Sequence, residues 1–283
     1  MVFRVGCHVS ISGSVDFAFE RAKKLCCNTF QIFTKNPRGW SAKQLNENEV
    51  RSFKKQLEQR ILFPIISHIS YLPNLASQSK EIYEKSIKSF LLELDRSLTL
   101  SIPYFIVHGG SYKGGTKEQG FVTYIDSILK GVEIANGKTV ILIENSSGGK
   151  NSVSGVLPDI EKILNEINDR KAVQVCFDTC HAFSAGYDLK NRKGVFNTLE
   201  EMQSTIGIEN VAIIHANDSK GELGSHRDIH EHIGLGKIGE AGFKELVNHP
   251  LLSKKPWILE TPVNETRGDS DNIDYLRMLR NEV

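Results

Sequence analysis

The feature that most constrains the fold of this chain is a short apolar run that ends in one ionisable side chain and recurs along the sequence. The runs IPYFIVH, TVILIE and NVAIIH are three examples. The residues that end such runs are His68, His108, Glu144, Asp178, His215 and Glu260. Nearly continuous apolar runs of this length are typical of strands in a parallel sheet that is covered on both faces.

Segments whose apolar residues follow helical spacing separate these runs. In one of them Tyr83, Ile87, Leu91 and Leu94 form a single apolar stripe. The predicted strands span residues 3–9, 28–33, 64–68, 103–108, 139–144, 173–178, 210–215 and 255–260. The predicted helices span residues 14–25, 43–60, 79–98, 118–135, 156–167, 197–206, 240–248 and 270–280.

Eight strands alternating with eight helices in 283 residues predict an α/β protein with a closed (β/α)8 TIM barrel. No Pro/Gly/Ser linker or low-complexity tract interrupts the chain, so we expect a single domain over residues 1–283. A doubly wound open sheet is the alternative, but GCHVSISG after the first run matches the GxGxxG phosphate-binding turn poorly. In a barrel the carboxyl ends of all strands face one mouth, so the six ionisable residues would meet in one cavity.

Charge and composition narrow the class of protein. The net charge of +1 argues against a global basic field that coats nucleic acid, although a local site can still bind phosphate. Five cysteines without zinc-finger spacing predict reduced thiols. The N-terminus lacks a signal-peptide pattern, and no apolar run approaches the roughly 20 residues of a membrane span. We therefore expect a cytoplasmic protein without membrane contact.

Three more potential metal ligands, His181, Asp228 and His230, lie in loops near the strand ends. A lone histidine or carboxylate at a strand end is usually structural, for example as a helix cap. Six consecutive ligand types at strand ends favour a metal site instead. Nine nitrogen and oxygen ligands exceed the three protein ligands of a typical catalytic zinc and suit two or three ions. Imidazole and carboxylate without thiolate are compatible with zinc, manganese or iron.

The other histidines and two of the cysteines receive different predictions. We interpret His226, His232 and His249 as structural, and Cys176 and Cys180 as packing residues. His8 ends the first run, and two interpretations stay open: it supports a ligand, or it faces a substrate.

Six motifs distributed over nearly the whole chain are long enough to compare with known families. They are FTKNPRGW (33–40), HISYLPNL (68–75), IENSSG (143–148), DTCHAFSAGYD (178–188), HANDSKGELGSHRDIHEHIGLGKIG (215–239) and ILET (258–261). Through these motifs the chain resembles the endonuclease IV family of apurinic/apyrimidinic (AP) endonucleases. Ile69 and Pro37 depart from the family pattern and affect loop conformation more than chemistry.

The resemblance implies a (β/α)8 barrel that holds three Zn²⁺ ions, with Mn²⁺ possible in part. The ligand sets that it implies are His68, His108 and Glu144 for one ion, Glu144, Asp178, His215 and Glu260 for the second, and His181, Asp228 and His230 for the third. Glu144 would bridge two ions.

The resemblance also implies a reaction and a substrate. The family hydrolyses the phosphodiester 5′ to an AP site in double-stranded DNA during DNA repair, leaving a 3′-hydroxyl and a 5′-deoxyribose phosphate. Clustered divalent ions suit this chemistry, because they can activate water at neutral pH and hold both the attacking and the leaving oxygen. The catalytic roles fall to Glu144, Asp178 and Glu260. The family also suggests a monomer.

Arg38, Tyr71 and Leu72 match family positions that insert into the DNA stack at the abasic site. Unstacking costs a few kcal/mol per step, and a missing base lowers that cost. Taken without the family, these residues would be a surface charge and two loop-packing residues. Four lysines could contact phosphates, although a solvated surface position is the expected interpretation of each: Lys35, Lys113, Lys117 and Lys220.

Two other functions fit part of the pattern. A metal-dependent sugar isomerase or epimerase of the same barrel superfamily usually needs fewer metal ligands, and the pairs Asp178–His181 and Asp228–His230 argue against it. A non-catalytic module that binds damaged DNA would not need a complete ligand set. Metal stoichiometry separates the first alternative from the nuclease, because the nuclease predicts three ions per chain.

Overall fold

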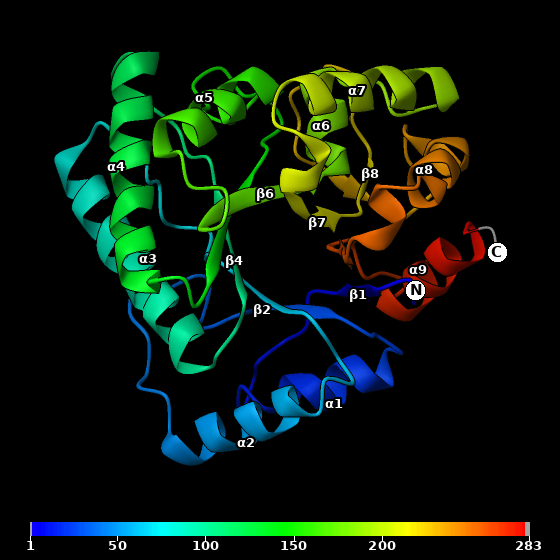
Figure 1. Cartoon of the computed structure of the whole chain (residues 1–283). Coiled ribbons are helices and arrows are strands. Elements are labelled where there is room, and N and C mark those ends of the chain that lie inside the picture. Colours follow the sequence, from blue (N-terminus) through cyan, green and yellow to red (C-terminus); the bar gives the residue numbers. More distant parts are fainter. Residues whose placement is uncertain (1, 281–283) are drawn as a thin grey trace.

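Eight parallel strands form the centre of the molecule, and helices surround them (Figure 1). The computed structural model describes residues 2–280. The barrel strands are β1 (Val5–Cys7), β2 (Phe30–Phe33), β3 (Ile65–His68), β4 (Tyr104–His108), β5 (Val140–Glu144), β6 (Val173–Asp178), β7 (Val211–His215) and β10 (Trp257–Leu259). The helices are α1 (Phe17–Lys24), α2 (Glu47–Glu58), α3 (Lys80–Thr99), α4 (Lys117–Ala135), α5 (Leu157–Ile167), α6 (Thr179–Ala185), α7 (Arg192–Ser204), α8 (Gly239–Asn248), α9 (Asp269–Met278) and the short 3-10 helices η1 (Ile208–Asn210) and η2 (Leu252–Lys254).

The sheet closes almost completely on itself. Its order is β1-β10-β7-β6-β5-β4-β3-β2, so β2 to β7 pair in chain order and the first strand, β1, pairs with the last, β10. A parallel bridge between His8 and Gln31 joins the two outermost strands, β1 and β2. At the ends of the chain, α9 packs beside β1 (Figure 1). The predicted (β/α)8 barrel is therefore confirmed.

The register of the sheet brings the ends of neighbouring strands to one level. His108 pairs with Glu144 across β4 and β5, and Asp178 pairs with His215 across β6 and β7. Five strands end at the ionisable residue that the sequence predicts, and β10 ends one residue before Glu260. The mouth of the barrel is therefore lined by these six strand ends.

An apolar layer fills the barrel directly below this mouth. Its buried members are Ile66, Ile106, Leu142, Cys176, Ile213 and Ile258. Each lies two residues before one of the six ionisable residues in the sequence. Because side chains on a strand alternate with period two, residues that point into the barrel are followed two positions later by residues that also point inward. The apolar layer explains why the ionisable side chains converge, and it confirms Cys176 as a packing residue.

Three local predictions are wrong. His181 is predicted to lie in a loop but belongs to α6, because the Asp178 side chain accepts a hydrogen bond from His181 N and so caps the helix. Helix α2 begins at Glu47, because Asn46 and Glu49 form a capping box. Helix α7 begins at Arg192 instead of residue 197, with Asn191 as its cap.

The long loop after His215 also contains structure that the sequence did not predict. Two short antiparallel strands, β8 (Asp218–Ser219) and β9 (His230–Glu231), pair as a hairpin. The Asp218 carboxylate accepts hydrogen bonds from the backbone N–H groups of Gly234, Gly236 and Ile238, which holds the GLGKIG segment against this hairpin. The hairpin thus has a defined position at the barrel mouth.

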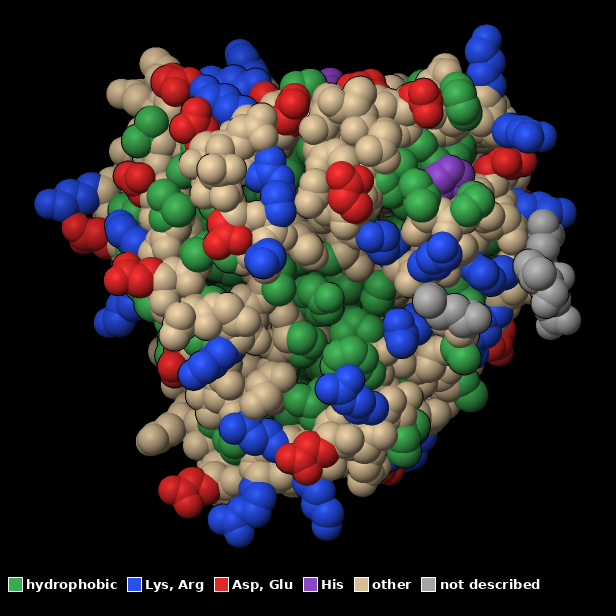
Figure 2. All heavy atoms as spheres, viewed as in Figure 1, with side chains coloured by type: hydrophobic (Ala, Val, Ile, Leu, Met, Phe, Trp, Pro, Cys, Tyr) green, Lys and Arg blue, Asp and Glu red, His purple; other side chains and the backbone are tan. Residues whose placement is uncertain are grey.

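The surface shows no single dominant charge on the face seen in Figure 2. Basic and acidic side chains are interspersed there around a central recess lined with hydrophobic side chains. This mixture agrees with the net charge of +1. Among residues 2–280, no helix is both long and apolar enough to cross a membrane.

Candidate metal centre

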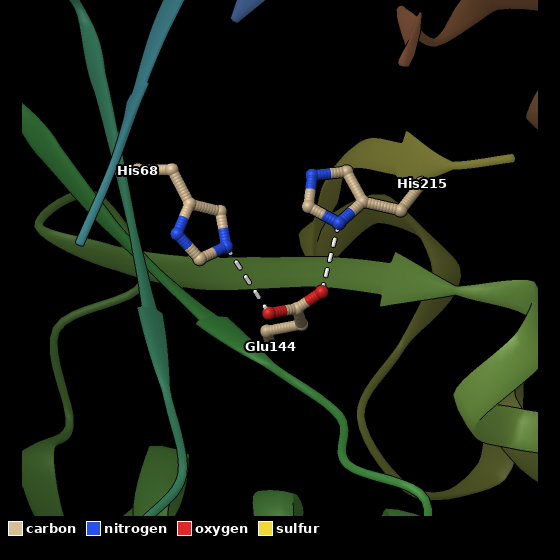
Figure 3. Close-up of side chains that lie close together, drawn as sticks. All are labelled: His68, Glu144 and His215. Atoms are coloured by element: carbon tan, nitrogen blue, oxygen red, sulfur yellow. Dashed lines mark hydrogen bonds and ion pairs between the residues drawn. The ribbon is translucent and has the colours of Figure 1, made fainter. Parts of the chain in front are cut away.

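Glu144 is the centre of a buried group of imidazoles at the barrel mouth. His68 Nε2 lies 3.3 Å from Glu144 Oε2, and His215 Nδ1 lies 2.7 Å from Glu144 Oε1. Figure 3 shows these two rings on opposite sides of the carboxylate, with a nitrogen of each directed at one oxygen. His108 Nε2 is 3.5 Å from Glu144 Oε2. Both carboxylate oxygens therefore face ligand nitrogens, which is the arrangement that a bridging carboxylate needs.

A second group shares Glu144 and His215 and adds two carboxylates. Glu144, Asp178, His215 and Glu260 each present a ligand atom, and these atoms all lie within 4.8 Å of one another. His215 Nδ1 is 3.8 Å from Asp178 Oδ2 and 3.5 Å from Glu260 Oε2. Burying charged carboxylates is costly unless a positive charge compensates them. Three carboxylates around one imidazole are therefore a donor set that fits a divalent cation.

The third group comes from α6 and the β8–β9 hairpin. His181 Nε2 and His230 Nε2 lie 3.1 and 3.2 Å from Asp228 Oδ1. His230 Nε2 is buried, but it has no hydrogen-bond partner among the described residues. A buried, unpaired nitrogen beside a carboxylate fits a metal ligand, because buried polar atoms are otherwise almost always hydrogen-bonded.

Backbone carbonyl groups orient three of the histidines. The Nδ1 atoms of His68, His181 and His230 lie 2.7, 2.9 and 3.0 Å from the carbonyl oxygens of Ile69, Asn145 and Glu260. Each Nδ1–H donates to its carbonyl, so each Nε2 is the atom that faces the cluster and offers its lone pair once deprotonated. Metal-binding histidines are typically oriented in this way.

Two residues of the first group, here counted with the second group as the inner half, have pKa values that favour metal binding. Burial acts to raise the pKa of Glu144, but the charge of His215 and the hydrogen bond from it hold this pKa well below its usual range. Burial, together with the charge of the neighbouring His68, lowers the pKa of His108 to about 4. Glu144 is therefore ionised and His108 neutral at pH 7, and these are the forms that bind a metal.

In the third group, here called the outer half, Asp228 and His230 form an ion pair. A metal cation can take the place of the proton in this pair. Burial acts to lower the pKa of His230, but the Asp228 carboxylate, 3.2 Å from Nε2, outweighs it and raises this pKa to about 9. Burial acts to raise the pKa of Asp228, while the adjacent imidazoles of His181 and His230 bring it well below its usual range. A metal would displace the proton on His230, because a ligand nitrogen must be deprotonated.

Cys180 also lies within ligand distance of the outer group. Its thiol, Asp228 and His230 form a further set whose ligand atoms are within 4.8 Å of one another. Burial raises the pKa of Cys180 to about 12, however, and the thiol donates to the carbonyl oxygen of Ile229 at 3.7 Å. A metal binds the thiolate form, so these observations support the predicted packing role.

Amide side chains that the sequence analysis missed hold the carboxylate ligands in place. Asn217 Nδ2 donates to Asp178 Oδ2 at 2.7 Å, and Asn217 Oδ1 accepts from Glu260 N at 2.8 Å. Asn145 bonds the backbone of Asp178 through both atoms of its amide. A third buried amide, Gln31, contacts Glu260 and His215. The available signal was a polar residue inside or directly after an apolar strand, as in FQIF, IEN and HAN.

The predicted DNA-contacting residues lie on two loops beside the cluster. Tyr71 is 63% exposed, and its ring packs edge-on against Phe33 at 5.2 Å. Tyr71 lines the same cavity, of about 370 Å³, as the metal-binding candidates. Arg38 is exposed, and Leu72 is half-buried. These positions are accessible to a ligand that lies across the barrel mouth.

Both interpretations of Lys35 are wrong. This lysine is buried, and its Nζ lies 3.4 Å from Glu93 Oε1 on α3. It donates to the hydroxyl of Ser70 at 3.0 Å and to the carbonyl oxygen of Gly39. Lys35 therefore cannot contact phosphate. Because Gly39 follows Arg38 and Ser70 precedes Tyr71, the buried pair ties the two mouth loops to α3.

The other predicted lysines and histidines mostly occupy structural or surface positions. Lys117 pairs with Asp159, and Lys220 pairs with Glu231, while Lys113 is exposed. His232 is buried between two asparagine side chains, at 3.0 Å from Asn264 and 2.9 Å from Asn272, which confirms its structural role. The exposed His226 contacts the carbonyl oxygen of Ser147.

A larger groove lies away from the mouth, between α7 and α8. Its volume is about 490 Å³, and Phe196, Leu199 and Leu251 contribute to its lining. None of the metal-binding candidates contributes to this groove. The volume of a cavity alone therefore does not identify the functional site. The cluster of metal-binding candidates does.

The fold and the cluster together define a TIM-barrel protein with a metal-binding mouth. A family model described as a xylose isomerase-like TIM barrel matches residues 19–280. A solved D-tagatose 3-epimerase-like protein has this fold as well, with a TM-score of 0.72 at 18% identity and coverage of 98% of both chains. At that identity the similarity concerns the fold alone.

Closer relatives share the whole chain. The protein named "Probable endonuclease 4" from Methanoculleus marisnigri is 44% identical over 276 residues, which cover 97% of this chain and 98% of the relative. The crystal structure of endonuclease IV from Thermus thermophilus superposes with a TM-score of 0.87 at 35% identity, covering 98% of both chains. The chain belongs to the endonuclease IV family.

Proposed function

We propose that this protein is an AP endonuclease of DNA repair, which hydrolyses the phosphodiester 5′ to an abasic site in duplex DNA. The products are a 3′-hydroxyl and a 5′-deoxyribose phosphate. Membership of the endonuclease IV family supports this reaction. The observation that carries the proposal is the set of three adjoining ligand groups at a mouth that also presents Tyr71.

The donor atoms support three divalent ions, with zinc as the proposed metal and manganese as a partial substitute. The ligand groups are His68, His108 and Glu144; Glu144, Asp178, His215 and Glu260; and His181, Asp228 and His230. Imidazole and carboxylate donors without a thiolate suit both metals. Bound there, the ions supply Lewis acidity and neutralise the charge of the phosphodiester.

Three carboxylates of this chain carry the reaction. Glu144 is central because both of its oxygens face the ligand histidines. Asp178 is held by Asn217 and caps α6, so it couples the inner and outer groups. Glu260 is 22% exposed and lines the cavity, so it is the carboxylate placed to hold an ion and orient an attacking water.

The mouth loops support recognition of an abasic site. Tyr71 and Leu72 follow β3, and Arg38 lies on the loop after β2. We propose that these side chains occupy the gap in the base stack, where the missing base reduces the cost of unstacking. The anchoring of both loops through Lys35 and Glu93 supports this role, because a preorganised wedge loses little conformational entropy on binding. The monomeric state and the cytoplasmic location stay predictions.

A nicking assay tests the reaction. The purified protein, loaded with zinc or manganese, is incubated with an end-labelled duplex that carries one abasic analogue, beside the same duplex without it. We expect a single nick on the 5′ side of the analogue, with a 3′-hydroxyl that a polymerase can extend. Metal analysis of the same sample should give three ions per chain. Intact abasic duplex with either metal would refute the proposed function.

The matched variant is Glu260→Gln, which preserves the shape of the side chain and removes its charge. We expect it to bind the abasic duplex with native affinity and to lose most turnover. Native turnover of this variant would refute the role of Glu260 while leaving the nuclease assignment in place.

A further inference from the structure

Gln31 lies at the point where the barrel closes. It belongs to β2, is buried, and forms the bridge with His8 that joins the ends of the sheet. Its carbonyl oxygen accepts a hydrogen bond from Val9 N at 2.8 Å, and on the other side Gln31 pairs with Ile66 of β3. Backbone contacts on both sides therefore hold this residue rigidly beside the metal-binding candidates.

The side-chain amide of Gln31 contacts two of those candidates and His8. Its Nε2 donates to Glu260 Oε1 at 2.6 Å and lies 3.0 Å from His8 Nδ1. Its Oε1 lies 2.8 Å from His215 Nε2. The amide cannot be turned around, because an ionised carboxylate only accepts hydrogen bonds and so requires the NH₂ group of Gln31. The amide oxygen must then face His215, which donates through Nε2–H.

This contact selects the form of His215 that can bind a metal. With Nε2–H held by Gln31, the proton that His215 gives up on metal binding is the one on Nδ1, and the lone pair is then on Nδ1. Nδ1 is the atom that faces the carboxylates, at 2.7 Å from Glu144 Oε1 and 3.5 Å from Glu260 Oε2. His68, His181 and His230 use the opposite nitrogen and are oriented by backbone carbonyl groups. His215 depends instead on a side chain, which a substitution can remove.

We propose that Gln31 is a positioning residue for the ion shared by His215 and Glu260. It holds His215 in the Nε2–H tautomer and engages Oε1 of Glu260, which leaves Nδ1 and Oε2 directed at the ion. The inference rests on the metal centre of the proposed function but is independent of the DNA reaction. The contact to His8 gives His8 a supporting role, one of the two interpretations that the sequence leaves open.

The test is the rate at which ions leave the protein. Gln31→Met retains the length of the side chain and removes the hydrogen bonds to Glu260, His215 and His8, and Gln174→Met on β6 is the matched control. Gln174 is half-buried and bonds the carbonyl oxygen of Arg170, away from the cluster. The zinc-loaded proteins are mixed with a colorimetric chelator in the absence of DNA, and circular dichroism of each verifies folding.

We expect one ion to leave Gln31→Met about 10 to 100 times faster than it leaves the native protein, the usual effect of losing such a supporting contact. The remaining ions, and all ions of Gln174→Met, should leave at native rates. Native rates for every ion of Gln31→Met would overturn the proposal. Equal acceleration of all ions, or the same acceleration in Gln174→Met, would also overturn it, because either result indicates general loosening.

A second measurement needs no variant and applies even when Gln31→Met does not fold. Nitrogen NMR of the zinc-loaded native protein, labelled at histidine, should show one metal-bound ring with its proton on Nε2 and its metal on Nδ1. A spectrum in which all metal-bound rings carry the proton on Nδ1 would refute the inference. A native protein that nicks no abasic duplex but gives the expected zinc kinetics would refute the proposed function and support the role of Gln31.

Discussion

The inner and outer halves of the ligand cluster differ in burial and in the elements that carry them. Four candidates of the inner half, His68, Glu144, Asp178 and His215, have side chains that are at most 3% exposed, while His108 and Glu260 at its rim are 37% and 22% exposed. In the outer half, Asp228 is 58% exposed. The inner ligands end β-strands, whereas His181 lies on α6, and Asp228 and His230 lie in the β8–β9 hairpin.

The elements that carry the two halves determine how rigidly each half is held. Each inner ligand is continuous with a strand that pairs on both sides, so its backbone is fixed by the barrel. The outer ligands depend on a short helix and a two-residue ladder, which open more readily than the core of a sheet. We infer that the inner ions are retained strongly and that the outer ion exchanges first.

Replacing the carboxylate at the centre of the inner half should have the largest effect. Glu144→Gln preserves shape but removes the charge that faces His68, His108 and His215. We expect the nicking rate to fall by at least about a thousandfold, since several kcal/mol of stabilisation depend on correctly held ions. Metal analysis should show the loss of more than one ion. Three retained ions with native turnover would contradict the bridging role.

Replacing the exposed carboxylate should affect the outer half alone. Asp228→Asn removes the charge between His181 and His230, so we expect one ion to be lost and the other two to stay. The nicking rate should fall about 10- to 100-fold, less than for Glu144→Gln. Metal content and single-turnover rates measure both effects. Loss of all ions would show that the two halves do not bind metal separately.

A change at the mouth should alter DNA affinity and leave both halves of the cluster intact. Tyr71→Ala removes an exposed ring, and aromatic stacking on a base contributes about 1–3 kcal/mol. We therefore expect abasic duplex to bind about tenfold more weakly. Tyr71→Phe is the control and should bind normally. The assay is fluorescence anisotropy with the inactive Glu260→Gln background, and a change in zinc content would contradict the assignment.

The smallest effect should come from the thiol beside the outer half. Cys180 lies near Asp228 and His230, but its pKa of about 12 keeps it protonated at neutral pH. Cys180→Ala should retain all its zinc and nick within about twofold of the native rate, a difference of less than about 1 kcal/mol. Loss of an ion in this variant would identify Cys180 as a ligand and change the composition of the outer half.

The inner half is the part of the site that the sequence predicts well. Each apolar run must place alternate side chains inside the barrel, so the position of Ile106 predicts the direction of His108, and Leu142 predicts that of Glu144. For the outer half, the sequence indicates three potential ligands in loops, and the family resemblance assigns them to one ion. Nothing in the local pattern around Asp228 and His230 indicates a hairpin, because a two-residue strand has no periodicity to detect.

Some residues have a structural role that the local sequence pattern does not indicate. Asp178 is a strand end and a metal-binding candidate, but it also caps α6 through His181 N, a helix that the sequence did not predict. Lys35 resembles a surface cation in the polar segment TKNPRGW, yet it is buried against Glu93. Such roles depend on partners that are distant in the sequence.

The sequence by itself determined the barrel and the six strand-end residues at its mouth, because apolar runs, helical spacing and period-two alternation are local properties of the chain. Only the tertiary structure decided how the ligands are supported. Gln31 and Glu260 are 229 residues apart, and their contact exists because β1 and β2 close the barrel. Hydrogen bonds of this kind depend on atomic distances across the barrel, and no local pattern encodes those distances.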